Sequence, residues 1–228
     1  MTTLNNPLFG LALLNKPKDK TSFYLVSFLR RLTNVRCIGH AGTLDPFATG
    51  LMVMLIGRPY TKLSNRFLLS DKEYSAKICL GSTTDSYDID GQTKSTSDKK
   101  PTLSEIESIL PEFRGEIDQC PPMFSAKKVN GKKLYELARK GIEIERKSKK
   151  VRVEIDLISY SYPYLELYVK CSSGTYIRSI AHDLGQRLSC GAYLETLVRT
   201  KVGPFNLNES QDCTILTDPS KLQIRRQF

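Results

Sequence analysis

The residues best suited to chemistry lie in one loop, residues 38–51, which holds a single carboxylate, Asp45. Its three glycines permit backbone conformations and close approaches that a side chain would block. Pro46 disfavours helical geometry at Asp45 and keeps the acid on an extended or turning backbone. Apolar residues flank the loop on both sides, so we predict that a rigid scaffold presents Asp45 as a reactive group. The alternative is an aspartate that only stabilises a turn.

Other catalytic patterns are missing from the sequence. There is no Ser/His/Asp ordering, no P-loop and no dinucleotide-binding fingerprint, whereas a carboxylate such as Asp45 can act as a covalent nucleophile. The six cysteines are scattered singly and there are only two histidines, which does not favour a zinc site. Residues 82–91 resemble a calcium loop but lack its terminal glutamate. We therefore expect no metal and no other cofactor.

Composition favours a globular protein with an anionic partner. The chain has 228 residues, 40% apolar and 25% charged, and a formal net charge of +10. Such a charge indicates nucleic acid, although charge alone does not separate RNA from DNA or an acidic membrane. No signal peptide is evident, and the longest apolar run, residues 51–57, is too short to span a bilayer. We expect a reduced, cytoplasmic protein that does not bind membranes.

Much of the positive charge lies between residues 127 and 152, where eleven Lys or Arg residues face three Glu residues. A charge run of this kind is most often a solvated face. Here Leu134 and Tyr135 interleave with the charges, and clustered cations are the pattern expected for phosphate contacts. We therefore favour RNA as the partner.

Segments around these residues show either the apolar spacing of a helix or the apolar/polar alternation of a strand. Antiparallel neighbours mixed with helices predict an α+β fold with a mixed, largely antiparallel central sheet flanked by helices. Residues 81–100 are rich in Ser, Thr, Asp and Gly and predict a long loop, and the tail is expected to pack back as a helix or an irregular strap. Strands are expected at 9–14, 51–56, 71–80, 151–157, 164–171 and 191–199, and helices at 21–32, 63–68, 102–110 (with a Thr102/Glu105 capping box) and 173–188.

The string GHAGTLDPFATGLM, residues 39–52, resembles the catalytic motif of the TruB family of tRNA pseudouridine synthases. Three further stretches match the family: Lys16–Pro17, residues 81–91 and residues 174–178. One departure is Asp19, where the family commonly has glycine. The resemblance extends over residues 9–205 and implies the pseudouridine synthase fold and an isomerase that flips its target base out of the RNA.

The resemblance also implies catalytic roles. Asp45 matches the aspartate that attacks or assists at the target ribose, while the uracil detaches, rotates and rejoins through carbon. Arg178 matches an arginine that pairs with this aspartate, which would favour the ionised carboxylate and orient it. From the residues alone, Arg178 could equally be a surface charge at a helix start.

Four further positions match residues that bind the substrate. His40 matches a histidine that helps to hold the flipped nucleotide, and Tyr74 matches the aromatic that stacks on the target base. Tyr176 and Leu197 match residues that line the uridine pocket. Without the resemblance, His40 could be a turn histidine, Tyr74 a half-buried strand residue, and the other two core residues. His182 matches no role and is expected to be structural.

The resemblance predicts a catalytic domain over residues 1–205 and a short tail, residues 206–228, without the PUA-type domain of many relatives. Residues 121–146 resemble an RNA-gripping insertion, in which we expect Lys127, Lys128, Lys132 and Lys133 to contact RNA. The expected function is conversion of the T-loop uridine (position 55) of tRNA to pseudouridine, with the T-arm as ligand and no obligatory protein partner. Two alternatives stay open: a non-catalytic tRNA-binding module, and a guide-RNA-dependent synthase subunit.

Overall fold

The computed structural model describes residues 8–129 and 131–227. The chain forms two compact units. Unit 1 contains the residues up to Tyr74 and those from Val198 onward, and unit 2 contains Ser75–Leu197. Helices and a mostly antiparallel sheet occur in both, which confirms the predicted α+β class. None of the described helices is long and apolar enough to cross a membrane.

Unit 1 is built around strand β3 (Thr49–Ile56), which has a strand on either side. Its side chains from Leu51 to Ile56 are fully buried, which explains the unbroken apolar run in the sequence. β1 (Gly10–Lys16) pairs with β3 antiparallel, and Val198 and Arg199 of β12 (Ala192–Val202) pair with it parallel. The remaining strands of this sheet are β2 (Ile38–His40), β13 (Phe205–Asn206) and β14 (Gln211–Asp212).

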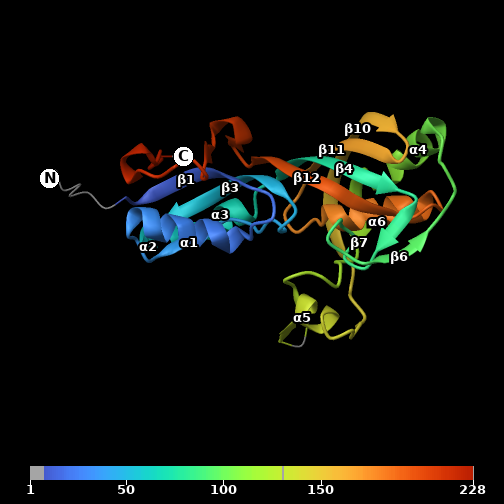
Figure 1. Cartoon of the computed structure of the whole chain (residues 1–228), viewed down its shortest axis with the longest axis horizontal. Coiled ribbons are helices and arrows are strands. Elements are labelled where there is room, and N and C mark those ends of the chain that lie inside the picture. The colour runs from blue at the N-terminus through green and yellow to red at the C-terminus, as the bar shows by residue number, and fades with distance from the viewer. Residues whose placement is uncertain (1–7, 130, 228) are drawn as a thin grey trace. The chain divides into compact units, whose positions relative to one another are not determined.

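Helix α1 (Ser22–Thr33) starts where the sequence predicts. The Thr21 side chain caps it by accepting a hydrogen bond from the Tyr24 amide, and the helix ends at Asn34 in the left-handed conformation. The single helix expected at 63–68 is instead two short ones, α2 (Arg58–Thr61) and α3 (Ser64–Leu68). Both α1 and α2 contact β2 (Figure 1).

Unit 2 contains the antiparallel strands that the alternating segments predict. β4 (Lys72–Leu80) buries every second side chain, as expected for a strand with one wet face. β11 (Tyr164–Cys171) pairs antiparallel with β10 (Lys149–Ser161), which pairs on its other side with β7 (Gly115–Gln119). The strand expected at 191–199 is part of β12, which lies inside the sheet next to β4 and has residues in both units.

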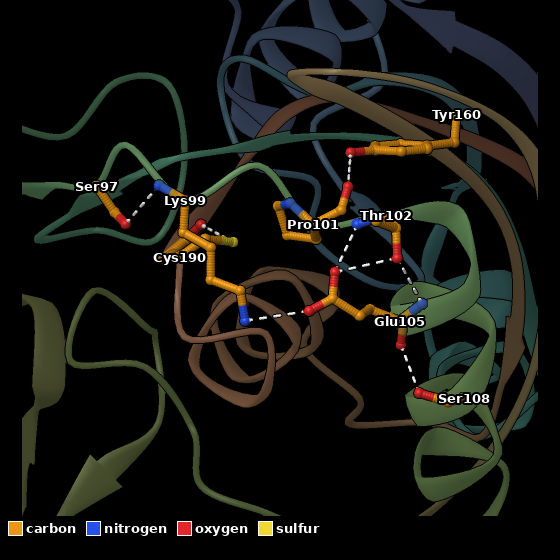
Figure 2. Close-up of polar contacts among 9 residues, drawn as sticks. Ser97, Lys99, Pro101, Thr102, Glu105, Ser108, Tyr160 and Cys190 are labelled. Atoms are coloured by element: carbon orange, nitrogen blue, oxygen red, sulfur yellow. Dashed lines mark hydrogen bonds and ion pairs between the residues drawn. The ribbon is translucent and has the colours of Figure 1, made fainter.

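Helix α6 (Ile177–Arg187) forms within the predicted 173–188 segment but begins four residues later than expected, and α4 (Leu103–Ile109) has the predicted capping box. Figure 2 shows Thr102 and Glu105 in reciprocal hydrogen bonds, with Lys99 3.4 Å from the same carboxylate. The Tyr160 hydroxyl donates to the Pro101 carbonyl and ties the start of α4 to β10. A short 3₁₀ helix, Leu110–Phe113, follows α4.

Of two expectations about irregular segments, the one for residues 81–100 was wrong and the one for the tail is confirmed. Residues 81–100 are not all loop, because β5 (Ser82–Thr84) and β6 (Thr93–Thr96) form a two-stranded hairpin. Their polar composition hid this pairing. The tail packs on unit 1 as an irregular strap: Leu216 and Leu222 are buried, but Ile215 is 80% exposed. The strap contains the 3₁₀ turns Leu207–Glu209 and Pro219–Lys221.

Candidate active site

The loop that carries Asp45, residues 41–48, joins β2 to β3 in unit 1. Ser22, the first residue of α1, holds the residue just before the acid. Its buried Oγ donates to the Leu44 carbonyl at 3.0 Å and accepts from the Leu44 amide at 2.9 Å. Both backbone polar groups of Leu44, its amide and its carbonyl, are thereby satisfied, which fixes the backbone where Asp45 begins.

Lys16, at the end of β1, holds the other side of the acid. Its ammonium is buried and donates to the carbonyls of Pro17, Lys20 and Pro46 at 2.9, 2.6 and 3.0 Å. Burial lowers the pKa of Lys16 to about 8, against the opposing attraction of the Asp45 and Asp19 carboxylates. The Lys–Pro pair noted in the sequence is therefore a structural part of the Asp45 loop.

Arg199 of β12 binds the first half of the loop and is almost fully buried. Its Nε donates to the Leu51 carbonyl at 2.8 Å, and its two Nη atoms donate to the carbonyls of Thr43 and Gly42 at 3.4 and 3.2 Å. Gly50 lets the β12 backbone pair closely with β3: it has φ +108°, and a Cβ there would stand 2.6 Å from the Arg199 amide nitrogen.

His40 and Tyr74, both predicted to bind the substrate, lie within the electrostatic reach of Arg199. Tyr74 is 8% exposed, and its hydroxyl shares a hydrogen bond with the Arg199 guanidinium. Burial and the Arg199 charge lower the pKa of His40, so its imidazole is neutral at physiological pH. Unit 1 therefore holds three predicted residues: His40 and Tyr74 interact with the buried Arg199, and Asp45 follows the two loop carbonyls that Arg199 binds.

Unit 2 holds the remaining predicted site residues. Arg178, in the first turn of α6, is 5% exposed and is not the surface charge of the simpler interpretation. Its Nη1 lies 3.1 Å from the Asp88 carboxylate, and it donates to the carbonyls of Ser86 and Phe124 at 3.1 and 2.8 Å. The family-like stretch 81–91 thus supplies a carboxylate partner for Arg178.

Tyr176 immediately precedes α6 and is held by its backbone. The buried Gln119 side chain accepts from the Tyr176 amide at 2.7 Å and donates to its carbonyl at 3.0 Å. The phenol is left half-buried, while Leu197 is buried, as a core residue or a pocket wall would be. His182 stacks on Tyr87 with ring centroids 3.8 Å apart, which fits the structural role expected for it.

The basic insertion, residues 121–146, contains the hairpin β8 (Lys128–Val129) and β9 (Lys132–Lys133) and helix α5 (Leu134–Ala138). Arg146 closes its base by donating to the Pro121 carbonyl at 3.1 Å. The α5 segment projects from the strands of unit 2 (Figure 1). Lys128 and Lys132 are exposed, Lys127 and Lys133 half-buried.

Sequence reasoning missed three side chains of this site: Ser22, Asp88 and Arg199. Each acts through a partner that is distant in the sequence or on another element. The only signal for Arg199 was an arginine at an inward position of an alternating strand. No group of three or more His, Cys, Asp or Glu side chains suited to a metal ion occurs within 8–129 and 131–227.

Two family models match the chain. The model described as TruB family pseudouridylate synthase (N terminal domain) matches residues 30–177, and that described as tRNA pseudouridylate synthase B C-terminal domain matches residues 178–222. A protein of Protochlamydia amoebophila named tRNA pseudouridine synthase B is 58% identical over 207 residues, 91% of this chain and 79% of the relative. Its namesake in Chlamydia muridarum is 56% identical, covering 96% of this chain and 91% of that protein.

Among solved structures, the chain is similar to one from a Cbf5-Nop10-Gar1 complex, with a TM-score of 0.72 and 26% identity. A chain from an H/ACA RNP bound to a substrate RNA containing 2'-deoxyuridine gives a TM-score of 0.69 at 24% identity, which bears on the fold alone. Both cover 92% of this chain, which spans about half the length of those proteins (54% and 53%).

Proposed function

Because the chain belongs to the TruB family of pseudouridylate synthases, an isomerase family, we propose that it converts the T-loop uridine of tRNA, position 55, to pseudouridine without a guide RNA. Relatives named tRNA pseudouridine synthase B, at 55–58% identity over most of the chain, support tRNA as the substrate. The chain from a Cbf5-Nop10-Gar1 complex is only 26% identical, which favours an enzyme that acts without such partners.

The observation that carries the proposal is the immobilised loop around Asp45. Backbone groups of Gly42, Thr43, Leu44 and Pro46 are all bound by buried side chains from other elements. A turn aspartate needs no such support, whereas a nucleophile must be held in a narrow range of positions relative to its target. This favours catalysis over the turn-stabilising role for Asp45.

In the proposed reaction, the bond from the ribose C1′ to the uracil N1 breaks and a bond from C1′ to C5 forms. The base turns between these steps, N1 gains a proton and C5 loses one, so substrate and product are isomers. Asp45 assists at the ribose or attacks it. Tyr74 supports the flipped base, His40 contacts the nucleotide as a neutral imidazole, and Arg178 faces the acid when the substrate is bound.

Tyr176 and Leu197 are proposed to line the uridine pocket, and Lys127, Lys128, Lys132 and Lys133 to bind phosphates of the T-arm. The exposed ammonium groups of the insertion suit this role because they are already hydrated and lie outside the core. We further propose a catalytic domain ending near residue 205, a cytoplasmic location and no obligatory protein partner. The domain boundary does not coincide with the division into compact units.

The test incubates the purified protein alone with an unmodified tRNA transcript and maps pseudouridine at nucleotide resolution. We expect conversion at the T-loop uridine by the unmutated protein. In Asp45→Asn the conversion rate should fall by about 1000-fold or more, while tRNA binding is retained. Asp98→Asn is the matched control, because Asp98 is exposed in unit 2. Tight binding without conversion by the unmutated protein would contradict the proposal and favour a binding module or a guide-dependent subunit.

A further inference from the structure

Unit 1 carries a group of basic side chains that the proposed reaction does not use. Residues 21–70 contain six Lys or Arg residues but a single carboxylate, Asp45. All six cations are exposed, and five of them come from α1, the segment after it, and α2 with its C-cap. We call them the α1–α2 surface: Arg30, Arg31, Arg36, Arg58 and Lys62.

Hydrogen bonds join the three segments of this surface. The Arg30 Nε donates to the Arg36 carbonyl at 3.0 Å, which ties the end of α1 to the segment after it. The next residue, Cys37, accepts from the Gly57 amide at 2.8 Å, and its Sγ lies 3.5 Å from the Thr61 Oγ1 of α2. The charges are therefore gathered on one corner of unit 1, where α1 and α2 both contact β2.

The charge of this corner is not neutralised by the protein. Within the described part of the chain, none of the five side chains forms an ion pair with a carboxylate. The basic insertion differs, since Lys133 lies 3.9 Å from Glu136 and Arg146 lies 3.1 Å from Glu143. Like charges held together without acidic partners produce a positive potential that attracts polyanions.

An exposed aromatic ring accompanies the cations. Phe23 is 58% exposed on α1, and the Arg30 guanidinium stands 5.6 Å from the centre of its ring. Helical spacing puts Phe23, Arg30 and Arg31 on the solvent side of α1, opposite the buried face that includes Leu25 and Leu29. Aromatic and arginine side chains together are typical of surfaces that contact RNA, because bases stack on both.

We propose that the α1–α2 surface binds phosphates of the substrate RNA, as a second basic contact in a different unit from the insertion. This inference rests on the proposed function only in taking RNA as the ligand. Because each phosphate that a cation neutralises releases counterions, the contact contributes to the salt dependence of binding as well as to affinity.

The test compares two triple variants of the full chain with equal charge. Arg31→Gln/Arg36→Gln/Arg58→Gln removes three charges of the surface, and Lys94→Gln/Lys221→Gln/Arg226→Gln removes three exposed charges elsewhere. Each lowers the formal net charge from +10 to +7 (10 − 3). The dissociation constant for an unmodified tRNA transcript is measured between about 50 and 200 mM salt, and thermal unfolding verifies that both variants fold.

We expect the surface variant to bind tRNA about tenfold more weakly or worse, with a salt slope about 2 to 3 smaller than that of the unmutated protein. The control should keep both values. Equal slopes and affinities in the two variants would overturn the inference and leave the surface merely solvated. The readout needs no conversion, so absence of pseudouridine would count against the proposed function and not against this surface.

Discussion

The Asp45 loop, residues 41–48, and the basic insertion, residues 121–146, are both irregular segments, but they are held in different ways. Buried side chains from α1, β1 and β12 each donate hydrogen bonds to a different backbone carbonyl of the loop. The insertion is tied at its base by Arg146 and folded by its own hairpin and short helix. Most of its remaining side chains are exposed or half-buried.

This difference reflects what each segment must provide: the loop a precisely positioned carboxylate, and the insertion a concentration of positive charge. A reacting carboxylate tolerates little displacement, so its loop is built into the core, where every lost hydrogen bond leaves a buried polar group without a partner. A phosphate contact depends on the position of a charge only loosely, because the attraction falls slowly with distance. Substitutions in the Asp45 loop should therefore change stability and catalysis together, whereas those in the insertion should change RNA affinity alone.

The largest loss is expected for Arg199→Met. Without the guanidinium, the carbonyls of Gly42, Thr43 and Leu51 lose a buried donor, so the free energy of unfolding should fall by about 3 to 5 kcal/mol and conversion should be lost. Urea unfolding measures the first effect and pseudouridine mapping the second. The control is Arg187→Met, because Arg187 is exposed on α6 and its ion pair with Glu112 should contribute under about 1 kcal/mol. Equal losses in both variants would contradict the assigned role of Arg199.

A smaller loss is expected for Ser22→Ala, which removes one hydroxyl and leaves the buried amide and carbonyl of Leu44 without it. The free energy of unfolding should fall by about 1 to 3 kcal/mol. Because Leu44 precedes Asp45, the conversion rate at saturating tRNA should also fall, by about tenfold or more. Ser27→Ala on the same helix should change neither quantity. A Ser22→Ala protein that is destabilised but converts tRNA at the full rate would show that the Ser22–Leu44 hydrogen bonds stabilise the fold without contributing to catalysis.

The sequence predicted structure that depends on local patterns better than structure that depends on contacts between distant residues. Local apolar patterns located β3, α1, β4 and α6: an unbroken apolar run predicted β3, and periodicity predicted the other three. The β5–β6 hairpin was missed since its Ser and Thr residues are equally typical of loops.

Within the site, the Asp45 motif was visible as a local string, but its supports were not. Arg199 reaches Leu51 across 148 residues only because β12 pairs parallel with β3. Likewise, the ion pair of Arg178 with Asp88 depends on the path of residues 81–91 in unit 2. No local pattern contains such partners, so they can be found only once the fold is known.

The contribution of Lys16, which supports the Asp45 loop, to the free energy of unfolding should depend on pH. Burial lowers its pKa to about 8 in the folded protein, below the value of 10.5 expected when unfolded. Between these values the unfolded chain binds more protons, so the free energy of unfolding rises with pH relative to Lys16→Met. Since a pKa difference of one corresponds to about 1.4 kcal/mol, the rise from pH 7.5 to pH 10 should be about 1 kcal/mol or more. Urea unfolding of both proteins at the two pH values measures it, and a flat or falling difference would show that the Lys16 ammonium is not buried.

The smallest effect on stability, and the sharpest contrast, is expected when Lys127, Lys128, Lys132 and Lys133 are all changed to Gln. None of these side chains is buried, so the free energy of unfolding should change by no more than about 0.5 to 1 kcal/mol. If the insertion binds phosphates, tRNA affinity should fall strongly, with a salt slope lower by about 3 to 4. The control replaces four exposed cations away from both basic surfaces: Lys94, Lys100, Lys221 and Arg226. A large loss of stability without a change in salt slope would mean that the insertion is part of the folded core, and the distinction between the two regions would then fail.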